Sequence, residues 1–371
     1  MTLTEQLQKQ YTEEQYSAQE AQLLAHLISW GPVVFQVARL LNKYGILQLL
    51  DEHNEGVTIQ QIEQETGLSS YAVKCLMEAA LTMHAVLIDD KNDVYTLAKT
   101  GWFLLNDPLV RVDIDFNQDV NYEGWFLLDE ALETGKPVGL RHFGDWKTIY
   151  EGLSSLPEQV QKSWFGFDHY YSDHSFGEAL KIIFRNEVNN LLDVGGNTGK
   201  FARKVVEYDK NVNVTVCDLP QQLEMMRKQT AGHPAEGRVH AQPINLLDNN
   251  MAFPNDKHYD VIWMSQLLDC FGEEEIKSIL CRAARIMDDK SRIYIMETLW
   301  DRQKYQAAAL SLTMTSLYFT ALANGNSKMY NTDDMSRLVE ESGLEIETIY
   351  DNIGMGGHSI LVCKTRQQNL I

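Results

Sequence analysis

One acidic, glycine-rich segment is the strongest candidate for chemistry in this chain of 371 residues. It reads Leu191-Leu192-Asp193-Val194-Gly195-Gly196-Asn197-Thr198-Gly199, and an amphipathic stretch begins at Lys200. Glycines allow a tight turn and let a ligand lie against bare backbone, while the first turn of a helix offers unpaired N–H groups. The segment therefore predicts a nucleotide-type site between a strand and a helix.

The spacing within this segment favours one cofactor over another. A dinucleotide site follows the pattern G-x-G-x-x-G, whereas here Asp193 lies just before Gly195 and the last glycine is Gly199. We interpret this spacing as a site for S-adenosylmethionine, because the amino acid end of that cofactor carries an ammonium group that a carboxylate can receive. The alternative is a tight turn without a ligand.

A second acid follows the next predicted strand. The β-prone run 213–217 ends in Asp218-Leu219-Pro220. An acid about 20 residues beyond a glycine turn is where a ribose diol is bound in nucleotide-binding sheets. Asp218 also suits the N-cap of a helix that opens with Pro220, so this role stays open. The two acids together predict an adenosyl cofactor.

Alternating strands and helices must position these groups. Apolar strand candidates lie at 191–194, 214–217, 261–264 and 292–296, with a final strand at 360–363. Helical segments separate them, which predicts an α/β class fold with a doubly wound parallel sheet. Ligands bind such sheets at the carboxyl ends of the strands.

The first third of the chain has a different pattern. Apolar residues recur at helical spacing over 25–50, and two short helices follow, the second capped by Ser69. A hairpin around 89–93 completes a winged-helix pattern. Its second helix carries Lys74 and Glu78 among apolar residues, whereas DNA contacts need Arg, Lys, Asn and Gln. We interpret this part as an assembly module; a DNA-binding regulator with a cofactor domain is the alternative.

Composition narrows the possible partners. The net charge is −20, with 44% hydrophobic residues, which indicates a globular protein and disfavours nucleic acid and anionic membrane as partners. The chain shows no signal peptide and no apolar run approaching roughly 18 residues. Its 5 cysteines lack metal-binding spacing, so we expect reduced thiols, a cytoplasmic location and no metal.

Three parts are expected: a winged-helix-like dimerisation domain at 1–110, a helical aromatic connector at 111–185 and the cofactor domain at 186–371. The connector contains an aromatic run at 164–171; core packing explains most of it, but part could line a pocket for a planar substrate. The segment 307–323 is apolar nearly all round, which predicts burial in a core or against a partner. Homodimerisation through this helix and the N-terminal domain is expected.

With these features in place, the chain resembles the small-molecule S-adenosylmethionine-dependent O-methyltransferases of the plant caffeate and hydroxyindole type, and their bacterial relatives, over nearly its whole length. Asn197 replaces a usual glycine of that family. The family has an acid near the adenine after the third strand of its sheet. Asn245 stands at that place here, with Asp248 as the alternative. The resemblance implies cofactor contacts from Asp193, Gly195, Gly196, Gly199, Asp218, Leu219, Asn245, Leu246, Ser265, Gln266, Ser175 and Tyr171. Substrate contacts are expected from Phe167 by the same resemblance, and from His169, Met314 and Tyr318 in the aromatic run and the apolar helix.

The strongest departure from this family is catalytic. Asp269 stands where the family's catalytic histidine should be, Cys270 where its neighbouring acid should be, and Glu297 matches an acid that orients the histidine. A free aspartate has a pKa near 3.9 and is a feeble base at pH 7. Burial beside Glu297 would raise the pKa of one carboxylate, so that Asp269 could act as the base. Catalysis by positioning alone, and a helix-capping role for Asp269, are the alternatives.

These expectations converge on an O-methyltransferase that acts on a phenolic or enolic small molecule and releases S-adenosylhomocysteine. Because the histidine is missing, one alternative is a relative that binds the cofactor without transferring methyl, as in hydroxylation or decarboxylation. Transfer to nitrogen or carbon is another. The identity of the acceptor is left open.

Overall fold

The computed structural model describes residues 3, 5–172, 174–234 and 236–366. The chain divides into two compact units: one comprises 1–12, 121–161 and 168–371, and the other comprises 13–120 and 162–167. We call them the catalytic unit and the N-terminal unit. Segments 121–161 and 168–185, expected as part of a connector, are in the same unit as the sheet.

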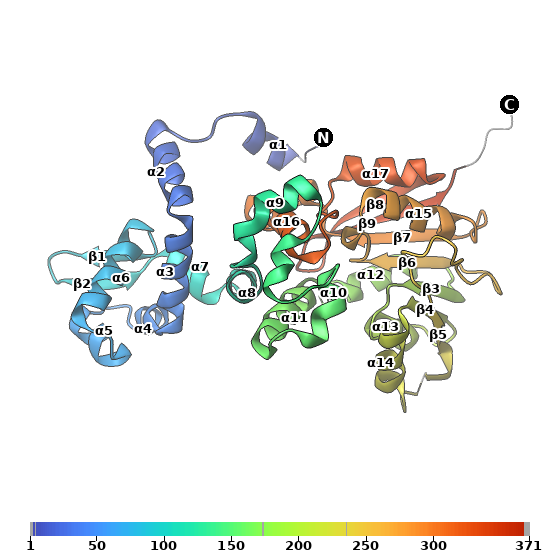
Figure 1. The fold of residues 1–371 in the computed structure, drawn as a ribbon, viewed down its shortest axis with the longest axis horizontal. Coiled ribbons are helices and arrows are strands. Elements are labelled where there is room, and N and C mark those ends of the chain that lie inside the picture. The colour runs from blue at the N-terminus through green and yellow to red at the C-terminus, as the bar shows by residue number, and fades with distance from the viewer. Residues whose placement is uncertain (1–2, 4, 173, 235, 367–371) are drawn as a thin grey trace. The chain divides into compact units, whose positions relative to one another are not determined.

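A sheet of 7 strands in the order β5-β4-β3-β6-β7-β9-β8 forms the centre of the catalytic unit (Figure 1). Neighbours from β5 to β7 are parallel, whereas β9 is antiparallel to both β7 and β8. The predicted doubly wound fold is confirmed, with β5 and β8 as additional edge strands. The strands are β3 (Asn190–Val194), β4 (Asn213–Asp218), β5 (Val239–Pro243), β6 (Val261–Ser265), β7 (Arg292–Glu297), β8 (Leu344–Ile353) and β9 (His358–Thr365).

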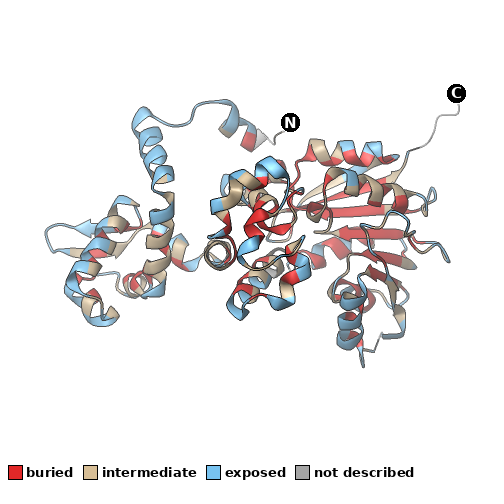
Figure 2. Cartoon of the chain, viewed as in Figure 1, coloured by how far each residue is buried: buried red, intermediate tan, exposed pale blue. Residues whose placement is uncertain are grey.

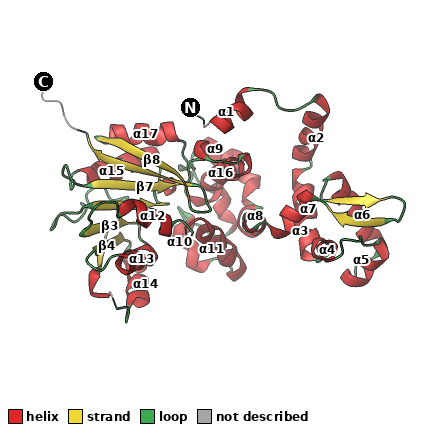
Figure 3. Cartoon of the chain, turned by 180° about the vertical axis from the view of Figure 1, so that it is seen from behind, coloured by secondary structure: helices red, strands yellow, loops and turns green. Residues whose placement is uncertain are grey.

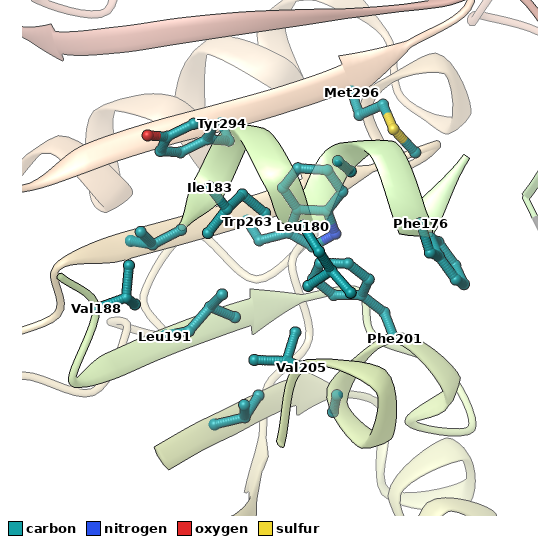
Figure 4. Packing of buried hydrophobic residues seen from close by; sticks show 14 of the residues in the cluster. Phe176, Leu180, Ile183, Val188, Leu191, Phe201, Val205, Trp263, Tyr294 and Met296 are labelled. Carbon is teal, nitrogen blue, oxygen red and sulfur yellow. The ribbon is translucent and has the colours of Figure 1, made fainter. Parts of the chain in front are cut away.

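Helices cover both faces of this sheet, and this is why its central strands are apolar throughout. Neighbouring residues Leu191 and Leu192 belong to different cores on opposite faces. One core packs against α12, α13 and α14, where Phe201 stacks on Trp263 at 4.6 Å between ring centroids (Figure 4). The other packs against α15 and α17, and the strands between the cores are the most buried part of the unit (Figure 2).

The helices of the catalytic unit include a shared one, α11, which also contributes residues to the N-terminal unit. They are α1 (Glu5–Thr12), α9 (Leu128–Thr134), α10 (Ile149–Gly152), α11 (Glu158–Ser172), α12 (Phe176–Ile183), α13 (Lys200–Tyr208), α14 (Pro220–Thr230), α15 (Glu273–Ala284), α16 (Gln306–Tyr318) and α17 (Thr332–Glu341). Shorter turns are 3-10 helices at Gly124–Leu127, Val138–His142, Leu153–Ser155, Glu236–Arg238, Leu268–Cys270 and Trp300–Arg302, and a π-helix at Phe319–Ala323; the π-helix Asn117–Asn121 lies mostly in the N-terminal unit.

The apolar helix α16 is buried on one side only within its unit. Leu312 and Tyr318 are in the interior, whereas Leu310 and Met314 are exposed on the other side. The expected all-round burial is therefore not met by this chain's own catalytic unit.

The N-terminal unit consists of helices and one hairpin (Figure 3). Thr58 and Gln61 form a capping box at the start of α5, and the Ser69 side chain accepts from the Ala72 N–H at the start of α6. The antiparallel hairpin β1–β2 follows α6 directly, so the predicted helix-helix-hairpin order is present. The elements are α2 (Ala18–Ser29), α3 (Gly31–Lys43), α4 (Ile46–Glu52), α5 (Ile59–Thr66), α6 (Ser70–Thr82), β1 (Val86–Asp89), β2 (Val94–Leu97), α7 (Lys99–Asn106) and α8 (Pro108–Phe116).

Among the described residues, no single helix has the length and apolar character needed to cross a membrane. Only the pair α2 and α3, bent by 80° at the break, meets the length and composition test jointly.

Candidate functional site

The turn between β3 and α13 has a backbone that requires glycine at two positions. Gly195 and Gly199 have φ values of +73° and +71°, in the left-handed region that side chains disfavour. A Cβ on Gly195 would lie 2.5 Å from Leu267 Cδ1, and one on Gly199 would lie 2.4 Å from Met226 Cγ. Asn197 also has positive φ, +50°, which asparagine tolerates better than most residues. The turn is thus a tight, backbone-lined loop, as the sequence predicts.

Asp193, at the end of β3, carries a buried oxygen that lacks a partner. The residue is 2% exposed, and its Oδ2 has no hydrogen bond within the part of the chain that the structure describes. Burial, and secondarily the charge of Asp218, raise the pKa of Asp193 to about 8. A Cβ on Gly196 would lie 2.6 Å from this oxygen, so glycine leaves room beside it. A cationic N–H donor placed here would satisfy the oxygen, and the residues therefore fit the ammonium group of S-adenosylmethionine.

Asp218, at the end of β4, joins this turn to the next helix. Its Oδ2 accepts from the Asn197 N–H at 2.8 Å and its Oδ1 from the Leu219 N–H at 2.7 Å. Burial raises the pKa of Asp218, and the two backbone donors oppose this rise. Each oxygen retains a lone pair that a ribose hydroxyl could use. The helix-cap alternative for Asp218 is wrong, because the N-cap of α14 is Leu219.

The other predicted cofactor residues lie mostly along the same edge of the sheet. Ser265 ends β6 and Gln266 follows it with φ +46°. Asn245 follows β5 but is exposed, and its Oδ1 accepts from the Leu247 N–H at 3.0 Å. Leu246 follows Asn245, and its carbonyl accepts from Arg282.

Two further cofactor predictions lie elsewhere in the unit. Ser175 is buried at the start of α12, next to Gly354. Tyr171 belongs to α11, and its side chain lies outside the described part of the structure, as does that of His169.

A second pair of carboxylates follows β6 and β7. Glu297 is 3% exposed, and its Oε1 accepts from the N–H groups of Leu267 at 3.0 Å and Leu268 at 2.8 Å. Its Oε2 is buried and makes no hydrogen bond to any described residue. Asp269 is 7% exposed in the 3-10 turn Leu268–Cys270. The cap of α15 is Gly272, so the capping alternative for Asp269 is wrong.

Burial dominates the electrostatics of this pair. It raises the pKa of Asp269 to about 7, with the charge of Asp168 adding to the rise and the Cys270 thiol opposing it. Burial, and then the charge of Asp269, raise the pKa of Glu297 well above its ordinary value. A carboxyl that titrates near neutrality can take a proton and release it again at physiological pH.

Three residues at this site have no local sequence signal. The Tyr150 hydroxyl donates to Cys270 Sγ at 3.3 Å, and the Asn324 amide donates to the Cys270 carbonyl at 2.7 Å. The Tyr330 hydroxyl donates to the Phe271 carbonyl at 2.8 Å. All three come from segments distant in sequence, so only the fold brings them to the loop after β6.

The predicted substrate residues belong to two different units. Tyr318 is buried on α16, and Met314 on the same helix is exposed. Phe167 belongs to the N-terminal unit, where its ring stacks on Phe116 at 4.1 Å. The contacts of these residues with substrate therefore stay predictions.

Comparison with known proteins identifies two domains. Residues 22–95 match a Dimerisation2-like domain, and residues 167–349 match a methyltransferase domain. Among curated proteins, L-tyrosine C(3)-methyltransferase of Streptomyces lavendulae is 22% identical over 90% of each chain. Cephaeline 6'-O-methyltransferase of Carapichea ipecacuanha is 21% identical over 83% of this chain and 86% of its own.

Solved structures show the same fold over nearly the whole chain. The S-adenosylmethionine-dependent methyltransferase SibL superposes with a TM-score of 0.69 and 22% identity, covering 92% of this chain and 98% of its own. The mitomycin 7-O-methyltransferase MmcR superposes with a TM-score of 0.66 and 18% identity, covering 93% of this chain and 98% of its own.

Proposed function

We infer that this chain, which belongs to the S-adenosylmethionine-dependent O-methyltransferase family, transfers a methyl group to a hydroxyl of a phenolic or enolic small molecule. One observation carries the inference. The unpartnered, buried oxygen of Asp193 beside a glycine turn lies on the same sheet edge as the buried pair Asp269 and Glu297. A cofactor site and a proton-accepting site thus follow neighbouring strands.

The first pair of acids would hold the cofactor. The Oδ2 of Asp193 would receive the ammonium group, and the free lone pairs of Asp218 would accept from the ribose hydroxyls. When bound, S-adenosylmethionine supplies an electrophilic methyl on a sulfonium and leaves as S-adenosylhomocysteine. The bare backbone from Gly195 to Gly199 allows this ligand to lie close to the turn.

The second pair would act on the acceptor. A phenol has a pKa of about 10, so removal of its proton makes the oxygen a better nucleophile. Asp269, with its raised pKa of about 7, is matched to this task. Glu297 fixes the loop that carries Asp269 through its bonds to two backbone amides. The acceptor loses its proton to Asp269 as its oxygen forms the new bond to carbon.

A transfer assay tests this function. The full chain is incubated with S-adenosylmethionine labelled on the methyl group and a panel of phenols and enols, and products are read by mass spectrometry. We expect one labelled methyl ether together with S-adenosylhomocysteine. Tight cofactor binding without label transfer to any acceptor would instead favour the relative that binds the cofactor but does not methylate.

Transfer to carbon is the second candidate, because the tyrosine C(3)-methyltransferase matches 90% of both chains. Removing the phenol proton also makes the ring carbons beside the oxygen nucleophilic, so the same base would serve. Carbon NMR of the labelled product separates the two outcomes, since a methyl on oxygen and a methyl on a ring carbon resonate far apart.

A second copy of the chain is the expected partner. The N-terminal unit has an apolar groove of about 260 Å³ between α2, α3 and α6, whose lining includes Leu27, Val34 and Met83. Trp30 is 63% exposed beside it, and α2 has no buried residue. This exposure, the Dimerisation2-like domain and the exposed side of α16 support a homodimer.

Sedimentation tests the dimer. The wild type should sediment as a dimer at micromolar concentration, and Trp30→Ser with Val33→Ser should shift it toward the monomer. Tyr71→Ser, an exposed aromatic on α6 outside the groove lining, is the control. A wild type that is monomeric at this concentration would contradict the proposal.

The remaining expectations concern location and nucleic acid. The 5 cysteines are free, which supports a reducing, cytoplasmic location. The second helix of the winged-helix-like part, α6, is mainly apolar, and we expect no shift of random duplex DNA in electrophoresis at physiological salt.

A further inference from the structure

Cys270, which is half-buried, lies between two polar groups in a chain of hydrogen bonds. The Tyr150 hydroxyl donates to its Sγ at 3.3 Å, and the Sγ is 3.5 Å from Asp269 Oδ1. Its backbone is fixed as well, because its carbonyl accepts from Asn324 and its N–H donates to the Leu267 carbonyl at 3.2 Å. The thiol is therefore held at one place between a tyrosine and a carboxylate.

The chemistry of these groups determines which of them donates in each hydrogen bond. An ionised carboxylate can only accept, so the thiol must donate to Asp269. The thiol sulfur then accepts a hydrogen bond from the tyrosine hydroxyl, so that both donors point toward Asp269. This arrangement suits the ionised form of Asp269, which the backbone N–H groups of Asp269 and Cys270 also favour, and it orients Oδ1.

Other acidic groups around Asp269 favour its protonated form. Glu297 on β7 and Asp168 on α11 are acids that face it, and Tyr330 interacts with it electrostatically from the segment before α17. Burial and the negative charge of Asp168 raise the pKa of Asp269, whereas the thiol contact lowers it. Among the side chains that shift this pKa, the thiol is thus the one that favours the basic form.

We propose that Cys270 and Tyr150 are positioning residues for methyl transfer, in that they orient one oxygen of Asp269 and keep the carboxylate ready to accept a proton. The proposal rests on the proposed function, in which Asp269 is the base. Neither side chain needs to touch the substrate for this role.

The direct test is a titration of the Asp269 carboxyl in the full chain. Protein labelled with [4-¹³C]aspartate is followed by NMR, and the Asp269 signal is assigned by its loss in Asp269→Asn. We expect a midpoint near 7 in the wild type, and a rise of about one pH unit in Cys270→Ala, because a donor to the charged form is lost.

Three further variants sharpen this test. Cys270→Ser retains a donor and should stay close to the wild type. Tyr150→Phe should raise the midpoint by less than Cys270→Ala, because it acts through the sulfur. Cys281→Ala is the matched control, since this thiol donates to the Ser342 carbonyl in the same unit and should change nothing. If Cys270→Ala fails to fold, the Asp269 midpoint in Tyr150→Phe still tests the proposal.

The pH profile of kcat for the acceptor identified in the transfer assay provides the second readout. The kinetic pKa should rise in parallel with the NMR midpoint, with KM for S-adenosylmethionine unchanged. An NMR midpoint that stays at the wild-type value in Cys270→Ala and Tyr150→Phe overturns the proposal. A midpoint that moves while the kinetic pKa does not also overturns it, and in that case persisting transfer shows that the proposed function itself still stands.

Discussion

Two pairs of carboxylates stand at the same edge of the sheet, and they are built alike. Asp218 accepts two backbone N–H groups, and so does Glu297. The other member of each pair, Asp193 or Asp269, is also buried; Asp193 has an oxygen without a hydrogen bond to any described residue, and Asp269 is within hydrogen-bond reach of the Cys270 thiol. In both pairs, one acid accepts from the backbone of a loop; in the first pair we propose that this acid, Asp218, also accepts from the ribose hydroxyls.

The surroundings of the two open acids differ. Asp193 lies against glycine backbone, so a ligand can approach it closely. Asp269 lies against a thiol and other acids; burial, with the charge of Asp168, raises its pKa to about 7, and the thiol opposes this rise. We therefore propose that the same pairing of acids serves cofactor binding in one place and proton transfer in the other. The following predictions test this division, from the largest expected effect to the smallest.

The largest effect is expected for Asp269→Asn. The substitution keeps the volume and removes the ability to accept a proton, so the rate of transfer should fall by roughly 10²–10⁴. Cofactor affinity should be nearly unchanged, because the lost interaction belongs to the transition state. Single-turnover kinetics and calorimetry measure the two quantities. Full activity in this variant would mean that the acceptor arrives already ionised and that positioning alone drives the reaction.

A smaller effect is expected for Asp218→Ala. Loss of the ribose contact should weaken cofactor binding by at least about tenfold, or 1.4 kcal/mol. Asp209→Ala is the matched control, since Asp209 also accepts two backbone N–H groups, from Asn211 and Val212, at the far end of α13. Calorimetry in which both variants bind as tightly as the wild type would remove Asp218 from the site.

The third prediction concerns stability against pH and is measured on Tm, not on activity. The pKa of Asp193 is about 8 in the folded chain and 3.8 ordinarily, so the folded state binds the proton more tightly. Stability from this group therefore falls as pH rises from about 4 to about 8. Without cofactor, Asp193→Asn should gain Tm relative to the wild type as pH is raised from 5 to 8. If the Tm values of the two proteins changed in parallel over this pH range, a raised pKa for Asp193 would be contradicted.

The sequence predicts the parts whose signals are local. Fully buried strands are apolar runs, and the glycine turn needs backbone conformations that few other residues adopt. The edge strands β5 and β8 were missed because they are only partly buried and alternate polar with apolar residues. Tyr150 could not be predicted, because its place beside Cys270 depends on how segments far apart in the chain pack.

The amide of Asn197 points to a consequence for sequence variation. Its hydrogen bond to Asp218 comes from the main-chain N–H, so this bond does not depend on the side chain at position 197. Any residue that accepts a left-handed conformation can complete the turn. The departure from the glycine usual in the resembled family therefore leaves the bond to Asp218 in place, and asparagine makes the unbound loop stiffer than glycine would, so that less entropy is lost when a ligand binds there.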